Sequence, residues 1–201
     1  LWCFCSMRGC LEEVYGEDSF EGIRVAIQGL GKVGFALAKR LHEAGAKLYV
    51  SDMDPELMAL ASRKFNADPI HSHEIYRVDC DIFSPCALGG VINQRSISNL
   101  SCRIIAGAAN NQLENIALSR DLMKKNILYA PDYVINAGGL INIYEELGHY
   151  DETRAYKRIS AIYGRIKDVF TLSREASIST AEAADRLAEA RLNVDKPSNG
   201  T

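Results

Sequence analysis

The residues best suited to chemistry in this sequence are three glycines in the stretch from Val25 to Gly34. Gly29, Gly31 and Gly34 form the pattern G-x-G-x-x-G directly after an apolar run that predicts a short buried strand. In such a turn the first glycine allows the tight bend, and the second lets a dinucleotide pyrophosphate approach the backbone. The third lets the following helix pack closely on the strand, and the amides at the start of that helix would hold the phosphates.

Asp52 adds a second element to this pattern. Residues 47–51 predict another strand, which ends at Asp52, eighteen residues after the last of the three glycines. An acidic residue near this spacing accepts hydrogen bonds from the ribose hydroxyls of a dinucleotide. Asp52 could instead cap the next helix, but Asp54 fits that role better because Pro55 follows it at the first helical position. An ordinary glycine turn without a ligand is the competing interpretation.

The composition limits the class of protein. With 201 residues and 47% hydrophobic residues, the chain can bury a sizeable core. Its net charge of −3 and the absence of a basic cluster make nucleic acid an unexpected partner. No apolar run approaches the roughly 18 residues that a membrane span needs, and the first residues do not resemble a signal peptide. We therefore expect a cytoplasmic protein without a membrane partner.

The cysteines do not suggest a metal centre. They lack the paired C-x-x-C spacing of zinc and thioredoxin-like sites, and no histidine cluster lies near them. We therefore expect no metal ligands and mostly buried, reduced thiols at Cys3, Cys5, Cys10, Cys80, Cys86 and Cys102.

Apolar periodicity divides the chain into four regions. Residues 1–20 predict an amphipathic linking helix, and residues 21–147 alternate strand and helix patterns as a dinucleotide-binding domain does. Residues 148–192 predict C-terminal helices that complete the domain and a hinge, and residues 193–201 predict a flexible tail. The expected fold is α/β, a Rossmann-type doubly wound sheet, mostly parallel, with additional C-terminal helices.

Small residues follow three further predicted strands. The stretches 86–90, 106–111 and 136–139 are rich in glycine, alanine and asparagine. In open α/β sheets, ligands lie beyond the carboxyl ends of the strands, where loops that pass close to a cofactor need small side chains. Ordinary turn chemistry would explain any one of these loops alone, but their repetition favours a cofactor.

These stretches carry a resemblance. The sequence from Gly22 to about Arg191 resembles the NAD-binding domain of the glutamate/leucine/phenylalanine/valine dehydrogenases, and its leucine-acting members look most similar. The matching motifs are QGLGKVG, CDIFSPCALG, AGAANNQL, YAPDYVINAGGLIN and AADRLAEARL. CDIFSPCALG and APDYVINAGG are far more specific than the glycine pattern.

The resemblance implies oxidative deamination of an L-amino acid to a 2-oxo acid and ammonia, with hydride passing to NAD. A branched-chain substrate, leucine above all, is the expected one, with Leu140 and Ile143 in the wall of its side-chain pocket. The residues implied to bind the cofactor are Gly29, Leu30, Gly31, Lys32, Val33, Gly34 and Phe35 for the pyrophosphate, Asp52 for the adenine ribose, and Ala87, Asn110 and Asn136 for the nicotinamide half.

The sequence also departs from the family. The catalytic lysine of these enzymes lies in a G-G-G-K stretch of a preceding substrate domain, together with a catalytic aspartate, and neither is found here. Because the sequence also begins at Leu1 rather than at methionine, we expect a piece of a longer, homo-oligomeric protein, inactive without its N-terminal substrate domain. Tyr144 stands where the family commonly has a small residue, which puts the shape of the pocket in doubt.

Two other functions fit the glycine pattern. A non-catalytic regulatory module that senses NAD would use the same turn and the same acidic residue. A methyltransferase binds S-adenosylmethionine with a similar turn. The stretch from Asn136 to Gly139 argues against the first, and a panel of the three cofactors would separate the second.

Overall fold

A six-stranded sheet forms the centre of the part of the chain that the structure describes, residues 2–136 and 152–194 of a computed structural model. The strand order is β3-β2-β1-β4-β5-β6, and every neighbouring pair is parallel. The expected doubly wound fold is confirmed, and these strands are wholly rather than mostly parallel. The strands are β1 (Arg24–Gln28), β2 (Lys47–Ser51), β3 (Asp68–Pro69), β4 (Ile82–Pro85), β5 (Ile104–Ile105) and β6 (Leu128–Tyr129).

Alternation along the strands gives the sheet two apolar faces. Val25 and Ile27 of β1 belong to one core cluster, and Ala26 between them belongs to the other. Ile82 and Phe83 of β4 divide in the same way. Because successive side chains in a strand point to opposite faces, a sheet buried on both sides needs apolar residues at every position. This explains why the strands appear in the sequence as continuous apolar runs.

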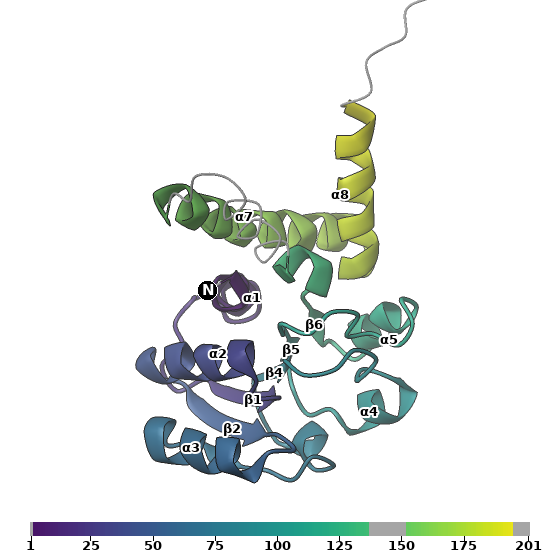
Figure 1. Ribbon diagram of the computed structural model, residues 1–201. Helices are drawn as coiled ribbons and strands as arrows, with labels where there is room; N and C mark the ends of the chain where they lie inside the picture. The colour runs from purple at the N-terminus through teal and green to yellow at the C-terminus, as the bar shows by residue number, and fades with distance from the viewer. Residues whose placement is uncertain (1, 137–151, 195–201) are drawn as a thin grey trace, which may run out of the picture.

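The helices cover these faces (Figure 1). Glycine or asparagine stands at the ends of three of them, and Gly16, Gly45 and Asn66 all have the positive φ of a left-handed helix end. A short 3-10 turn forms at Ile75–Arg77. The helices are α1 (Trp2–Tyr15), α2 (Lys32–Glu43), α3 (Pro55–Phe65), α4 (Gln94–Asn99), α5 (Leu118–Lys124), α7 (Glu152–Ala176) and α8 (Thr180–Val194).

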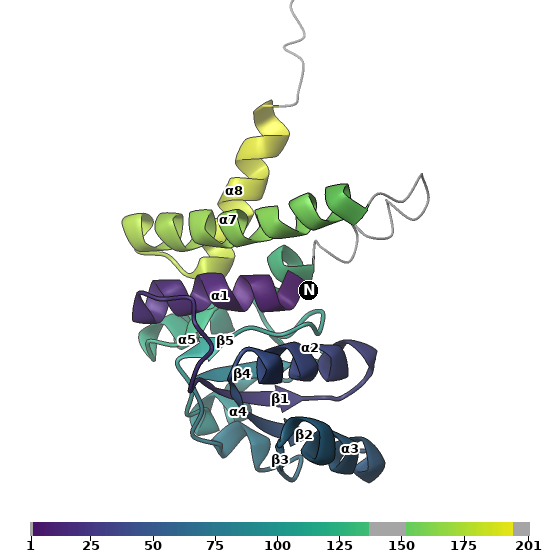
Figure 2. The ribbon, with the colours of Figure 1, turned by 90° about the vertical axis from the view of Figure 1, so that its left-hand side faces the viewer.

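Helix α1 is part of the core and not only a link. Met7 is fully buried, and α7 packs over α1, which is seen end-on below α7 in Figure 1 and from the side in Figure 2. A Cβ atom at Gly9 would come within 2.8 Å of the Ile166 side chain, so glycine allows this close approach. Lys167 also donates a hydrogen bond of 2.8 Å to Glu12. Helices α1 and α7, far apart in the sequence, therefore pack against each other beside the sheet.

Helix α8 begins at a local cap and extends away from the body (Figure 1). The Ser179 hydroxyl accepts a hydrogen bond from the Glu182 amide at 3.3 Å, and the Glu182 carboxylate accepts one from the Ser179 amide at 3.1 Å. This reciprocal pair is a capping box, so Ser179 caps the helix. The helix continues to Val194, two residues into the stretch that the sequence predicts as a tail. None of the described helices is long and apolar enough to cross a membrane.

Candidate dinucleotide-binding site

The turn between β1 and α2 lies where the strand order reverses, because β1 has β2 on one side and β4 on the other. Gly29 has a φ of +102°, which favours glycine, and its amide donates a hydrogen bond of 2.7 Å to the Ser51 carbonyl oxygen. A Cβ atom at Gly29 would lie 2.6 Å from the Cβ of Ala87, in the loop after β4. The turn is therefore held between the ends of two strands, at the place where open α/β sheets bind ligands.

The other two glycines of the motif differ in what requires them. A Cβ atom at Gly34 would overlap the Gly29 carbonyl oxygen and lie 3.3 Å from the Cys86 side chain, so the packing of α2 requires glycine. Gly31 has an ordinary φ of −60°, and a Cβ atom there would meet no atom of the described residues within 4 Å. Neither packing nor backbone conformation explains glycine at position 31. A bound group that lies against this backbone would explain it.

The start of α2 offers unsatisfied donors to such a group. Gly31 precedes the helix without a side chain to cap it, and the first amide bonded back to it is that of Phe35, at 2.9 Å. The amides of residues 32–34 have no acceptor inside an α-helix, and the helix dipole places partial positive charge there. The side chains of Lys32 and Val33 are exposed, whereas Phe35 packs on Phe65 with ring centroids 5.0 Å apart.

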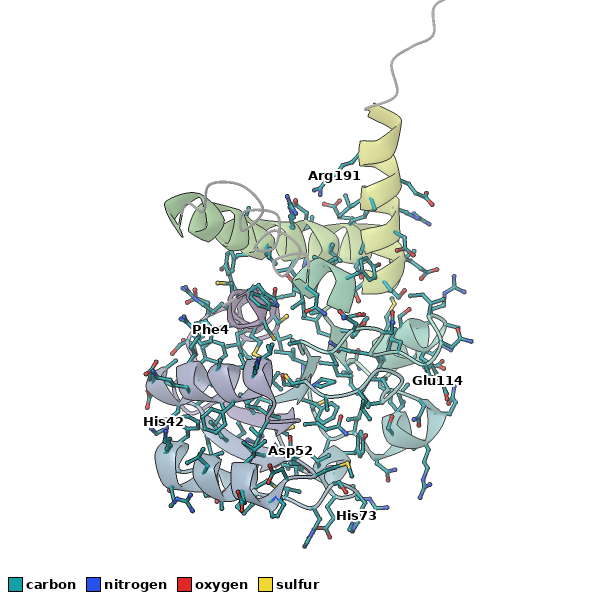
Figure 3. All side chains as sticks on the ribbon, in the orientation of Figure 1. Phe4, His42, Asp52, His73, Glu114 and Arg191 are labelled. Carbon is teal, nitrogen blue, oxygen red and sulfur yellow. The ribbon has the colours of Figure 1, made fainter. Side chains whose placement is uncertain are left out.

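Asp52 lies next to this turn at the end of β2 (Figure 3). Its carboxylate accepts a hydrogen bond of 2.5 Å from the Leu30 amide and one of 2.9 Å from the Asp54 amide. Asp54, not Asp52, caps α3, because its carboxylate accepts from the Glu56 amide at 2.8 Å. The capping alternative for Asp52 is therefore wrong. Backbone contacts instead fix the Asp52 carboxylate beside the glycine turn, with lone pairs left for other donors.

Asn110 and Asn136, which the sequence predicts to contact the nicotinamide half of the cofactor, lie together at the other half of the carboxyl edge of the sheet. The Asn136 side-chain nitrogen donates a hydrogen bond of 2.7 Å to the Asn110 side-chain oxygen and a longer one of 3.3 Å to the Ala109 carbonyl oxygen. The Asn136 side-chain oxygen is buried and has no donor within the described ranges. A buried carbonyl oxygen without a partner is costly, so it is a natural acceptor for a ligand amide.

Two glutamines organise this edge and carry no recognisable signal in the sequence. Gln112 is fully buried and donates hydrogen bonds to the carbonyl oxygens of Gly107 at 2.9 Å and Ala109 at 3.0 Å, which shapes the loop after β5. Gln28 ends β1 and donates a hydrogen bond of 2.7 Å to the Tyr76 hydroxyl. A lone glutamine beside small residues predicts nothing in particular, because its partners lie in other loops.

The thiol beside the turn is uncharged. Burial raises the pKa of the Cys86 thiol, so at neutral pH it is not a nucleophile. Four of the six cysteines are buried, and all are free, as the sequence predicts. In the part of the chain that the structure describes, no three His, Cys, Asp or Glu side chains gather closely enough to hold a metal ion. The two predicted pocket residues, Leu140 and Ile143, lie outside the described residues.

The arrangement fits a dinucleotide along the carboxyl edge of the sheet. Free amides and an unobstructed glycine lie at the centre, a fixed carboxylate at one side, and an asparagine pair at the other. A family model for glutamate/leucine/phenylalanine/valine dehydrogenase matches residues 49–192. The chain belongs to this family. Its cofactor is accordingly NAD, as the sequence predicts.

Individual relatives agree with this membership. An L-tryptophan dehydrogenase from Nostoc punctiforme is 48% identical over 98% of this chain and 56% of its own length. A leucine dehydrogenase from Thermoactinomyces intermedius is 45% identical over 97% of this chain and 53% of its own length. The crystal structure of the Nostoc punctiforme enzyme covers 96% of this chain and 59% of that chain, with a TM-score of 0.93. The chain thus spans about half the length of the curated relatives it matches.

The likeness extends further at the level of the fold. A hetero-hexameric glutamate dehydrogenase from Thermus thermophilus covers 98% of this chain and 55% of that chain, with a TM-score of 0.67 at 20% identity. At that identity the likeness shows a shared fold alone.

Proposed function

We propose that this chain is the NAD-binding part of an amino-acid dehydrogenase that converts an L-amino acid to its 2-oxo acid and ammonia. The observation that carries the proposal is the open backbone at Gly31, where no atom in the described part of the chain would oppose a Cβ atom, beside the fixed carboxylate of Asp52. The family membership supports the reaction class. An NAD-sensing module without chemistry is the alternative, and turnover by the whole protein separates the two.

Each group at the edge has a role in this proposal. NAD, when bound, supplies the acceptor for a hydride from the substrate α-carbon. The amides of residues 32–34 hold the pyrophosphate, and the Asp52 carboxylate accepts from the adenine ribose hydroxyls. Ala87, Asn110 and Asn136 orient the nicotinamide half. The unpaired side-chain oxygen of Asn136 is suited to accept a hydrogen bond from a carboxamide.

We assign the proton transfers to residues outside this sequence. Deprotonating an amino group and hydrolysing an imine need a base of suitable pKa facing a closed cleft. Among the described residues, this edge offers amides, the Asp52 carboxylate, which binds two backbone amides, the buried Asp132 carboxylate and an uncharged thiol. The chain should therefore bind NADH, seen as a change in NADH fluorescence, and form no NADH from NAD and L-leucine. Turnover above background by the purified chain would refute the assignment.

We propose a branched-chain amino acid as the substrate of the whole protein. Two bulky apolar side chains three residues apart, Leu140 and Ile143, would share one helical face and leave room for a branched aliphatic group. They would offer no partner to a side-chain carboxylate. Tryptophan is the second candidate, because the Nostoc punctiforme L-tryptophan dehydrogenase is 48% identical. The ratio of kcat/KM for leucine and tryptophan in the whole protein decides between them.

We propose also that the whole protein is a cytoplasmic homo-oligomer. The family membership supports this proposal. Light scattering of the whole protein measures its oligomeric state.

A further inference from the structure

Asp132 is a buried carboxylate that the proposed chemistry does not use. It is 8% exposed and stands just after β6, in the first turn of the helix that carries Asn136. One carboxylate oxygen accepts a hydrogen bond of 2.7 Å from the Tyr129 hydroxyl, and the other accepts one of 2.6 Å from the Asn111 amide. A carboxylate at this depth is stable only when both oxygens are bonded, so its partners are fixed.

The partner amide belongs to a strained residue at the centre of two other loops. Asn111 has a φ of +53°, which only a few non-glycine residues adopt. Its carbonyl oxygen accepts a hydrogen bond of 2.7 Å from the Gly90 amide in the loop after β4. A Cβ atom at Gly89 would lie 2.8 Å from the Asn110 carbonyl oxygen, so these loops are in close contact. The Asp132 carboxylate thus joins the loops after β4, β5 and β6 through one backbone residue.

The helical turn from Asp132 to Asn136 contacts the dipeptide of Asn110 and Asn111 at two points. Asp132 and Asn136 are four residues apart and lie on the same side of the helix. Asp132 binds the backbone of Asn111, and Asn136 binds the side chain of Asn110 at 2.7 Å. Together with the hydrogen bond from the Gly90 amide to the Asn111 carbonyl oxygen, these two contacts determine the orientation of the dipeptide. The direction of the Asn110 and Asn136 amides therefore depends on Asp132.

The Tyr129 hydroxyl, which donates the second hydrogen bond to the Asp132 carboxylate, does not ionise at neutral pH. Burial, and next the charge of Asp132, raise the pKa of the Tyr129 hydroxyl far above its ordinary value. The hydroxyl therefore stays protonated and donates to the carboxylate. Tyr129 is itself held by the core, since it is 2% exposed and its carbonyl oxygen accepts a hydrogen bond of 2.6 Å from Thr180.

We propose that Asp132 is a positioning residue for the nicotinamide half of NAD, acting through the Asn110 and Asn136 pair. The inference rests on the proposed function, which assigns those asparagines to that half of the cofactor. Asp132 is too deeply buried behind Asn111 to be a catalytic group. Its effect is confined to one half of the cofactor, because the glycine turn and Asp52 are held by separate contacts at β1 and β2.

The test compares two ligands on the same variants of this chain. NADH occupies both halves of the site, whereas ADP occupies only the adenine and phosphate half. For Asp132→Ala we expect the Kd of NADH to rise about tenfold or more while the Kd of ADP stays within about twofold. Asp132→Asn keeps an acceptor for the Asn111 amide and should lose only about threefold. Asp185→Ala is the control, since Asp185 also accepts from a tyrosine hydroxyl, Tyr133 at 2.8 Å, but no hydrogen bond in the described residues joins it to Asn110, Asn111 or Asn136.

The outcomes separate the possible explanations. Equal NADH affinity in Asp132→Ala and wild type overturns the inference, and so does a parallel loss of NADH and ADP affinity, which would indicate a purely structural role. If Asp132→Ala does not fold, the ratio of the two Kd values in Asp132→Asn decides in the same way. A wild-type chain that binds neither ligand overturns the proposed function and this inference with it.

Discussion

Replacing two glycines of the same motif by alanine should have opposite consequences. Gly31→Ala places a methyl group where no atom of residues 2–136 or 152–194 lies within 4 Å, at a φ of −60° that alanine adopts freely. Gly34→Ala places one against the Gly29 carbonyl oxygen, with the Gly29 carbonyl carbon only 3.0 Å away. We expect the first change to weaken NADH binding and preserve stability, and the second to lower stability.

The magnitudes follow from these contacts. Alanine is a worse helix cap than glycine by roughly 0.5–1 kcal/mol, which lowers stability. Alanine also reduces the entropy of the unfolded chain, which raises stability by a comparable amount. Because these two effects oppose each other, Gly31→Ala should change the free energy of unfolding by less than about 1 kcal/mol. At Gly34, alanine gains about 1 kcal/mol in helix propensity, but the clash is with backbone that no side-chain rotation relieves. Overpacking of this kind costs about 3 kcal/mol, so we expect a net loss of about 2 kcal/mol.

The assay pairs thermal unfolding with NADH titration. For a domain of this size, about 2 kcal/mol corresponds to a Tm lower by about 4–8 °C in Gly34→Ala. In Gly31→Ala the Tm should stay close to that of wild type, while the Kd of NADH rises at least tenfold, because the methyl group occupies the space assigned to the pyrophosphate. Wild-type NADH affinity in Gly31→Ala would refute the assignment of the turn. A wild-type Tm in Gly34→Ala would refute the packing argument.

Three further predictions concern the cofactor, pH and substrate. The Asp52 carboxylate should repel a 2′-phosphate, so NAD should bind more tightly than NADP, and Asp52→Ala should narrow the difference in Kd. Hydrogen bonds from Arg120 and Ser179 lower the pKa of Glu182 to about 2 in the folded chain, below the value of about 4.3 in the unfolded chain. These bonds therefore stabilise the fold fully above about pH 4.3, and their contribution is lost as the pH falls from there toward 2. Acid unfolding followed by circular dichroism should show this loss in wild type and not in Glu182→Gln. In the whole protein, Leu140→Gly should raise kcat/KM for aromatic substrates relative to leucine, and no gain would exclude Leu140 from the pocket.

The amino-acid sequence by itself determined the parts of the site that depend on local backbone. The glycine turn, the strand that ends at Asp52 and the cap at Asp54 follow from periodicity and from residues with special φ or capping ability. Helix ends at Gly16 and Asn66 follow for the same reason. These features need only a few neighbouring residues, so their signals survive in the linear sequence.

Tertiary structure alone decided which distant residues meet. The contact of Gly29 with Ala87, the pairing of Asn110 with Asn136, and the bond from Asn111 to Asp132 each join loops that follow different strands. Only the order of strands in the sheet brings those loops together, and no periodicity in the chain encodes which carbonyl a given amide will reach. The packing of α7 on α1 is of the same kind, because it depends on Gly9 facing Ile166 across most of the sequence.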